Sequence, residues 1–158
     1  MKTTTRAVGI IVYKDEVLLI KRRNQKHHYF VFPGGGVEEN ETVEAAVLRE
    51  VKEETTLNVK IEKLLYHHNY GMQGEQFFYL CKYISGTPHL EEDSVEKQLM
   101  ANSDDNSWEP LWVKVNELKH MLVYPLEIRD DLLKDIENDF ATCPRETKIN
   151  VRDLRQAL

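Results

Sequence analysis

The feature that most constrains this chain is a run of three glutamates near the end of a predicted helix, in Arg49-Glu50-Val51-Lys52-Glu53-Glu54. At about 100° of rotation per residue, Glu50, Glu53 and Glu54 fall on one face of that helix, where their charges repel each other. A chain tolerates such a cluster if water solvates it, or if a divalent cation binds to it. The residues around the cluster help to distinguish these alternatives.

An apolar stripe runs along the same helix, as expected of a helix that packs on a core. It consists of Val43, Ala46, Val47 and Val51. Glu50 lies one heptad after Val43 and Glu54 one heptad after Val47, so both carboxylates continue the inward-facing stripe. Carboxylates that face a protein interior need protons, cations or a metal ion. From this pattern alone, a solvated acidic face remains an equal alternative.

A short predicted strand at residues 30–32 precedes the helix and is followed by Pro33 and three glycines at 34–36. Glycine allows positive φ and a close approach of backbone to a ligand. Thr42 is a credible N-cap of the helix. A strand, a glycine-rich turn and a helix with carboxylates together predict a phosphate and metal site, whereas three glycines alone would indicate a flexible loop.

The segment from Gly35 to Leu57 resembles the Nudix box, the pattern G-x5-E-x7-R-E-U-x-E-E-x-G-U in which U is bulky and apolar. The positions in register are Gly35, Glu41, Arg49, Glu50, Val51, Glu53, Glu54 and Leu57. Thr56 stands where the box has glycine, and a β-branched residue is disfavoured where a helix ends in the left-handed region. Asn40 replaces another common glycine, but asparagine accepts left-handed geometry better than most residues. These departures concern the local turns and remove no carboxylate.

The resemblance implies a divalent metal ion, Mg²⁺ with Mn²⁺ as the alternative, and names its ligands. Glu53 and Glu54 are the firmest ligands, Glu50 is a ligand or the base that acts on water, and a carbonyl of the glycine segment, Gly34, completes the set. Magnesium favours carboxylate oxygens, which agrees with this set. In the family the base sometimes lies outside the box, and the acidic candidates here are Glu92, Glu96, Asp104, Asp105 and Glu109. Each of these alone is more often a solvated loop charge.

Further residues of the same region are expected to support or bind. Arg49 lies one turn before Glu53 and is expected to hold that carboxylate for catalysis. The resemblance also implies a contact between Glu41 and Arg49, which makes Glu41 a structural support. The candidates for substrate binding are Arg22, Arg23, Gly35 and Gly36, although a basic loop such as the one around Arg22 and Arg23 is more often merely solvated.

The composition of the whole chain excludes several other classes. The 158 residues suit a single domain over 1–158, and the net charge of -6 argues against a nucleic-acid-binding surface. Cys81 and Cys143 show no metal-ligand or disulfide spacing, and Cys81 is expected in the core. We find no segment able to span a bilayer and no signal-peptide layout, so cytoplasm is the default location.

Hydrophobic periodicity predicts an α/β chain in which hairpins enclose one helix and a second helix closes the fold. Strands are predicted at 7–13, 17–20, 29–32, 58–68, 76–84 and 111–115. Helices are predicted from Thr42 onward, at 116–120 and at 125–140, with polar loops at 22–28 and 91–106. Residues 144–158 are expected to be a C-terminal tail or a short helix. This order agrees with the Nudix fold, a mixed sheet sandwiched between helices.

The predicted function is a Mg²⁺-dependent Nudix pyrophosphohydrolase that acts on a nucleoside diphosphate linked to another group. Elimination leaves nucleoside triphosphates, including oxidised ones, as the weakly favoured substrate, with dinucleoside polyphosphates and nucleotide sugars as alternatives. The absence of proline between Leu57 and Pro88 argues against ADP-ribose. A Nudix-fold domain that binds a nucleotide without cleaving it is the rival hypothesis, and a metal-free acidic helix is a third. A homodimer is a family-level expectation.

Overall fold

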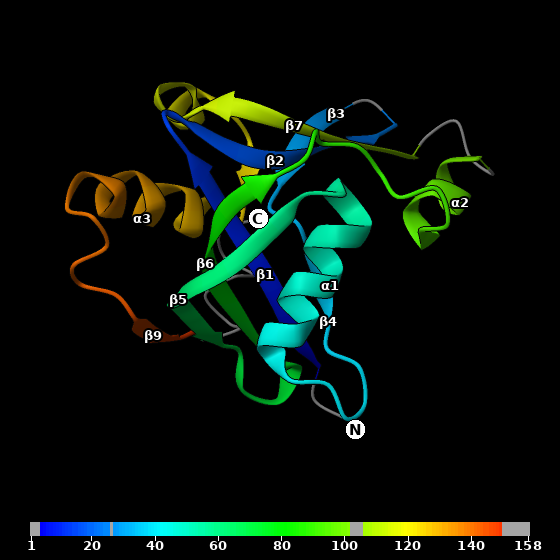
Figure 1. The fold of residues 1–158 in the computed structure, drawn as a ribbon. Helices are drawn as coiled ribbons and strands as arrows, with labels where there is room; N and C mark the ends of the chain where they lie inside the picture. The colour runs from blue at the N-terminus through cyan, green and yellow to red at the C-terminus, as the bar shows by residue number, and fades with distance from the viewer. Residues whose placement is uncertain (1–3, 26, 102–105, 150–158) are drawn as a thin grey trace.

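The structure is a computed structural model that describes residues 4–25, 27–101 and 106–149. These residues form one mixed sheet with helices on both faces (Figure 1). The strands are β1 (Thr5–Tyr13), β2 (Glu16–Asn24), β3 (His27–Val31), β4 (Gly34–Gly36), β5 (Asn58–Asn69), β6 (Glu75–Ser85), β7 (Asn106–Lys114), β8 (Val123–Tyr124) and β9 (Arg145–Lys148). The helices are α1 (Val43–Thr55), α2 (Val95–Ala101) and α3 (Leu126–Glu137), with 3-10 turns η1 (Gly71–Gln73) and η2 (Val115–His120).

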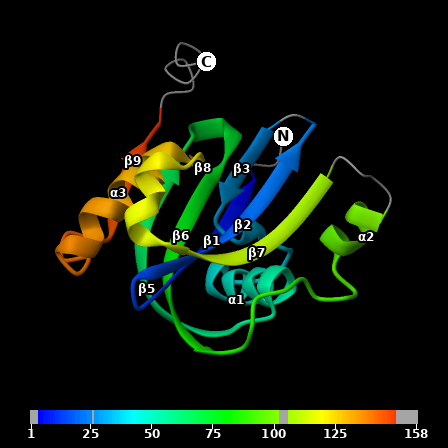
Figure 2. The same ribbon diagram turned by 90° about the horizontal axis from the view of Figure 1, so that it is seen from above.

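Strand β1 lies at the centre of the sheet, whose order is β8-β3-β2-β1-β6-β5-β9. It runs parallel to β6 and antiparallel to both β2 and β4. Its register with β2 covers Val12 and Tyr13, whereas its register with β4 covers residues 6–8. Because these two neighbours occupy different ends of β1, the half of the sheet with β2, β3 and β7 curls away from the half with β5 and β6 (Figure 2).

Two hydrophobic clusters hold the helices on the two faces of the sheet. Successive side chains of a strand point to opposite faces, so β1 contributes to both. Val8 and Ile10 pack in the cluster that includes Ile128 and Leu132 of α3. Ala7 and Ile11 pack in the cluster that includes Val47 and Val51 of α1. The site-bearing helix is therefore fixed on the face of β1 opposite to α3 (Figure 1).

The predicted α/β class, with a mixed sheet between helices, is confirmed. Every predicted strand overlaps a strand of the structure, the acidic helix is α1, and the closing helix is α3. The helix expected at 116–120 is the 3-10 turn η2. Cys81 is buried in the core as expected, and both cysteines are free.

The polar loop predicted at residues 22–28 is wrong. Strand β2 extends to Asn24 and pairs with both β3 and β7, so that Arg22 is the partner of Tyr29 and of Trp108. The guanidinium carbon of Arg22 lies 3.7 Å from the centroid of the Trp108 ring. Polar residues of this segment therefore lie in paired strands, where stacking on aromatic side chains of the neighbouring strands stabilises them, although their hydropathy predicts a loop.

The loop predicted at 91–106 is also wrong in part, since α2 forms at Val95–Ala101. The buried Ser94 accepts a hydrogen bond from the N–H of Lys97 at 3.1 Å, which is N-capping geometry. Within 144–158, the structure shows a strand, β9, parallel to β5, in place of the predicted tail or helix. Residues 150–158 of that prediction lie outside the described residues.

A buried polar network holds β9 beside α3 and β5. Asp135 of α3 is 2% exposed and accepts hydrogen bonds from the hydroxyl of Tyr66 at 2.6 Å and from Nη2 of Arg145 at 2.7 Å.

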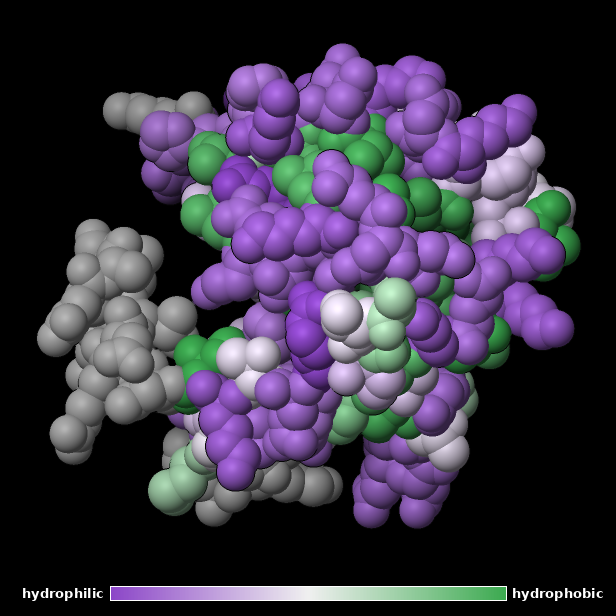
Figure 3. Space-filling model, turned by 90° about the vertical axis from the view of Figure 1, so that its left-hand side faces the viewer, coloured by the Kyte–Doolittle hydropathy of each residue, from purple (hydrophilic) through white to green (hydrophobic). Residues whose placement is uncertain are grey.

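The surface on the side of α3 and β9 is mostly hydrophilic, with hydrophobic patches between the polar side chains (Figure 3). Among the described residues, no helix has the length and apolar character needed to cross a bilayer.

Candidate active site

Helix α1 aims two of its glutamates at the sheet. The helix begins at the predicted N-cap, where the hydroxyl of Thr42 accepts a hydrogen bond from the N–H of Ala45 at 3.1 Å. From that start, the apolar stripe packs on β1, and its continuation buries the carboxylates of Glu50 and Glu54, which are 7% and 6% exposed. The prediction that these two side chains face inward is confirmed.

The three glycines form strand β4 instead of a loop, and none of them has positive φ. Their lack of side chains matters for a different reason than flexibility. A Cβ on Gly35 would overlap the carboxylate of Glu50, and a Cβ on Gly34 would lie 2.6 Å from the carbonyl oxygen of Ala7. The glycines therefore let β4 lie close to both β1 and the glutamates of α1.

The free edge of β4 presents backbone polar groups to α1. The N–H of Gly34 donates to Glu54 at 3.3 Å, and the carbonyl of Gly36 accepts from Nη2 of Arg49 at 2.9 Å. The antiparallel register pairs Gly34 with Val8, between the hydrogen-bonded residues that join β4 to β1, so its N–H and carbonyl both point to this free edge. In the structure Gly34 therefore contacts Glu54 through its N–H, whereas the metal ligand predicted from the sequence is its carbonyl.

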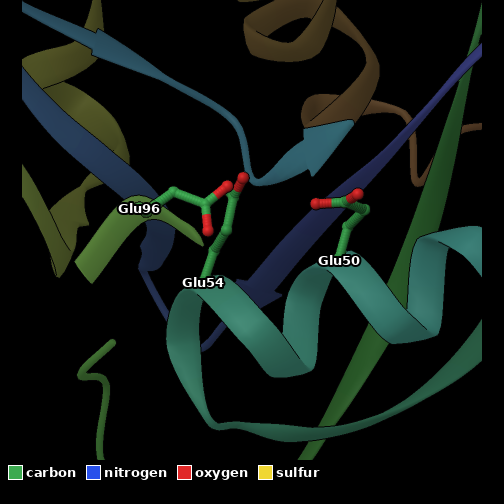
Figure 4. Close-up of side chains that lie close together, drawn as sticks. All are labelled: Glu50, Glu54 and Glu96. Atoms are coloured by element: carbon green, nitrogen blue, oxygen red, sulfur yellow. The ribbon is translucent and has the colours of Figure 1, made fainter. Parts of the chain in front are cut away.

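Helix α2 adds a third carboxylate to the pair from α1. Carboxylate oxygens of Glu50, Glu54 and Glu96 all lie within 4.8 Å of one another. Figure 4 shows Glu96 reaching from α2 toward Glu54, with β4 passing over the group. One carboxylate oxygen of Glu96, Oε2, is buried and has no hydrogen-bond partner among the described residues. An oxygen of this kind costs free energy unless a cation or a proton satisfies it.

The electrostatics of this carboxylate cluster favour a cation. Burial, together with the nearby charges of Glu50 and Glu96, raises the pKa of Glu54 to about 8. Burial also raises the pKa of Glu50, although the hydrogen bond from Arg49 opposes that rise. The three neighbouring carboxylates repel one another, and they offer only oxygen ligands. Such a group fits a hard divalent ion such as Mg²⁺.

Arg49 ties the outer side of the cluster together. Its Nε and Nη2 donate to the two carboxylate oxygens of Glu41 at 2.8 and 3.0 Å, and its Nη1 donates to Glu50 at 2.7 Å. The hydrogen bonds from Arg49 hold the pKa of Glu41 below its usual range, and the same contacts raise the pKa of Arg49. Arg49 thus fixes Glu50 more tightly than it fixes Glu53, whose carboxylate is 3.6 Å away.

Glu53 lies apart from the three grouped carboxylates, on a more exposed part of the helix, where 34% of its side chain is accessible. Burial raises its pKa and the charge of Arg49 opposes that rise. Its role as a ligand stays a prediction. Of the other acidic candidates, Glu92 pairs with Lys97 at 3.6 Å and Glu109 is exposed, whereas Asp104 and Asp105 lie outside the described residues.

The end of α1 shows how Thr56 replaces the expected glycine. Thr56 does adopt the left-handed conformation, with φ 59° and ψ 3°. Its hydroxyl donates to the carbonyl of Thr87 at 3.1 Å and lies 2.9 Å from Nδ1 of His89. The unfavourable backbone is thus offset by contacts with the segment that leads to α2. Asn40 is left-handed as well, with φ 62°.

A cavity of about 190 Å³ lies between β1 and β6 on one side and β3 and β8 on the other, on the face of β1 that bears Arg6 and Val8. Arg22 shares a face of β2 with Leu18, which packs in the cluster with α1, so Arg22 points to the α1 face of the sheet. The neighbouring Arg23 points to the opposite face, that of Leu19, which packs in the cluster with α3. The structure separates these two predicted phosphate contacts.

Comparison with known proteins agrees with this architecture. The family model described as the NUDIX domain matches residues 3–133. The chain belongs to the NUDIX family. A curated ADP-ribose pyrophosphatase of Methanocaldococcus jannaschii is 53% identical over 61 residues, which is 37% of this chain and 36% of that protein. The matched segment is thus about a third of that relative's length.

Solved structures extend the NUDIX likeness to most of the chain. A NUDIX hydrolase from Nitrosomonas europaea superposes with a TM-score of 0.71 at 19% identity, covering 95% of this chain and 80% of that one. A MutT structure from work on Aliivibrio salmonicida and Vibrio cholerae has a TM-score of 0.62 at 26% identity, covering 86% and 97%. NUDIX hydrolases generally depend on a divalent metal ion.

Sequence reasoning missed two features of the site of this NUDIX chain. It named Glu96 only among several loop charges, because the helix that aims it inward was not recognised. It did not name Arg6, which lines the cavity. The available signal for Glu96 was Ser94, a possible N-cap two residues earlier; for Arg6 it was the alternation of β1, which places Arg6 on the same face as Val8.

Proposed function

We propose that this chain is a pyrophosphohydrolase that cleaves a phosphoric anhydride bond of a nucleotide with Mg²⁺, or Mn²⁺, bound at the carboxylate cluster. The observation that carries this proposal is the grouping of Glu50, Glu54 and Glu96 within 4.8 Å, with an unpartnered buried oxygen on Glu96. Structural acidic faces are solvated, whereas Glu50 and Glu54 are buried.

The residues that would hold the metal are Glu50, Glu54 and Glu96, with Glu53 on the exposed side and the carbonyl of Gly34 on the free edge of β4. When bound, a divalent ion neutralises phosphate charge and acidifies water. The protein itself supplies position: Arg49 and Glu41 fix the Glu50 carboxylate, and the glycine strand keeps the space beside it open. Preorganised groups of this kind need no rearrangement during the reaction.

Within the box, Glu50 and Glu53 are the two candidates for the base that accepts a proton from water. Glu50 is held by Arg49 at 2.7 Å, which favours its ionised form, and burial acts in the opposite direction. Glu53 is more accessible to water. The pH dependence of turnover in Glu50→Gln and Glu53→Gln distinguishes them, because only loss of the base removes the acidic limb of the profile.

For the substrate we propose a group of nucleotide classes and not a single compound. Elimination weakly favours nucleoside triphosphates, with dinucleoside polyphosphates and nucleotide sugars as alternatives. The local likeness to an ADP-ribose pyrophosphatase supports including ADP-ribose, despite the missing proline. Arg22 is the better supported of the two predicted phosphate contacts, because it points to the face of the sheet that carries α1 and its glutamates. A cytoplasmic homodimer remains an expectation.

The experiment incubates the protein with Mg²⁺ and a panel of nucleoside triphosphates, dinucleoside polyphosphates, nucleotide sugars and ADP-ribose, and measures product release. Glu54→Gln tests the cluster, and Glu39→Gln, an exposed glutamate near the same helix, is the matched control. We expect turnover on at least one substrate, a loss of at least about 100-fold in Glu54→Gln, and no such loss in the control.

A domain that binds nucleotides without cleaving them is the rival proposal. It predicts tight nucleotide binding with no turnover on any substrate. That result would reject the hydrolase, whereas equal turnover in the wild type and Glu54→Gln would reject the carboxylate cluster as its site.

A further inference from the structure

The cavity between β1 and β6 on one side and β3 and β8 on the other has a mixed lining. Aromatic and apolar side chains form most of it, from Phe32, Phe78, Tyr124, Val8 and Pro125. Two polar side chains share the lining, Arg6 of β1 and Gln76 of β6, which are partners in the parallel register. Aromatic walls with few polar groups are typical of a site that takes a ring system.

Arg6 links this cavity to the strand that contacts the carboxylates. It lines the cavity from β1, and its antiparallel partner is Gly36 of β4, so both residues face the same side of the sheet. The preceding residues of β4 contact the carboxylates, since the N–H of Gly34 donates to Glu54 at 3.3 Å and Gly35 faces Glu50. A Cβ on Gly36 would meet no atom within 4 Å, so the space beside Arg6 on this face of β4 is open.

The guanidinium of Arg6 is available to a ligand. The ion pairs within the described part of the chain use Arg49, Arg129 and Arg145 but do not include Arg6. The Arg6 residue is exposed. A planar guanidinium offers a fork of N–H donors and no acceptor, which matches the oxygens of a phosphate.

We propose that Arg6 binds the phosphate group that connects the cleaved anhydride at the carboxylate cluster with the ring system in the aromatic cavity. This inference rests on the proposed function and deepens it by assigning a positioning residue and the orientation of the substrate. The nucleoside end enters the cavity lined by Phe32 and Phe78, its first phosphate lies against Arg6 over Gly36, and the anhydride extends toward Glu54.

The competing role for Arg6 is recognition of the base itself, since arginine also pairs with carbonyl-bearing base edges. The two roles differ in what Arg6 requires of the ligand. A phosphate contact is lost when the phosphate is absent, whereas a base contact persists in the free nucleoside. A comparison of phosphorylated and unphosphorylated ligands therefore decides between them.

The test measures binding of α,β-methylene nucleoside diphosphates, which resist hydrolysis, in the presence of Mg²⁺, and of the corresponding nucleosides. It compares the wild type with Arg6→Gln, Arg6→Lys and the control Lys82→Gln, which removes an exposed cation at the distal end of β6. We expect Arg6→Gln to weaken diphosphate binding at least tenfold and nucleoside binding less than twofold. Arg6→Lys should restore part of the loss, and the control should match the wild type.

Equal weakening of nucleosides and diphosphates in Arg6→Gln would overturn the inference in favour of base recognition or a structural role. Unchanged diphosphate affinity in Arg6→Gln, or the same loss in Lys82→Gln, would overturn it as well. The proposed function fails separately: in that case the wild type would cleave no nucleotide in the substrate panel. A turnover assay on the same variants adds a second readout, since loss of a phosphate contact raises KM.

Discussion

Gly35 of β4 faces the carboxylate of Glu50 so closely that a Cβ on the glycine would overlap it. This contact explains the glycine better than backbone flexibility does, since none of the three glycines of β4 has positive φ. Strand and helix thus form one unit, in which the absence of a side chain on β4 permits a buried carboxylate on α1.

We expect Gly35→Ala to destabilise the protein by about 1–3 kcal/mol, because the added methyl group forces Glu50 or β4 to move. Gly36→Ala is the matched comparison for stability, since a Cβ there meets no atom within 4 Å. Urea unfolding of both variants measures the difference. Equal midpoints for the two variants would show that the Gly35–Glu50 contact is not tight in solution.

The burial of Glu54 predicts a pH dependence of stability in the metal-free protein. Its folded pKa of about 8 lies above the ordinary glutamate pKa of 4.5, so the folded state favours the protonated form. The associated stability is present below the unfolded pKa and is lost as the pH rises from about 4.5 through about 8. In EDTA, the wild type should therefore become less stable over this window.

Glu54→Gln removes that titration. Without metal, we expect this variant to match the wild type near pH 5 and to exceed its stability at pH 9 by roughly 2–4 kcal/mol, since one pKa unit corresponds to about 1.4 kcal/mol. Added Mg²⁺ should stabilise the wild type at pH 8 more than the variant. Thermal melts at several pH values measure both effects, and parallel curves for the two proteins would contradict the prediction.

Arg49 is predicted to act on turnover more than on stability. Its fork holds Glu41 and Glu50 together, and a lysine has no planar fork with which to do so. We expect Arg49→Lys and Arg49→Ala to lose at least about 100-fold in kcat while remaining folded by circular dichroism. Lys114→Ala, which removes the exposed ion pair with Asp15 far from the glutamates of α1, is the control and should leave kcat unchanged and stability nearly so.

Thr56 allows a test of backbone strain at the end of α1. Thr56→Gly and Thr56→Ala both lose the hydroxyl contacts to Thr87 and His89, but only glycine relieves the left-handed backbone. We expect Thr56→Ala to be less stable than Thr56→Gly by about 1 kcal/mol. Urea midpoints of the pair measure this order, and the reverse order would mean that the turn relaxes out of the left-handed region.

The sequence by itself determined the local part of the site. Periodicity on one helix placed Glu50 and Glu54 on the inward face, and the N-cap at Thr42 fixed where that helix starts. These features depend on residues within a few turns of each other, so a helical wheel suffices to predict them.

Only the tertiary structure decided which other groups meet those carboxylates. The glycine segment became strand β4 because β1 offers it an edge. Glu96 joins the carboxylates, and Arg6 lines the cavity, from elements more than forty residues away from Glu54 in sequence. Such meetings depend on strand pairing and on helix packing between distant segments, and no short-range pattern encodes them. The sequence therefore specified the carboxylates of α1. The fold supplied the third carboxylate, the open space over Gly36 and the guanidinium of Arg6 beside that space.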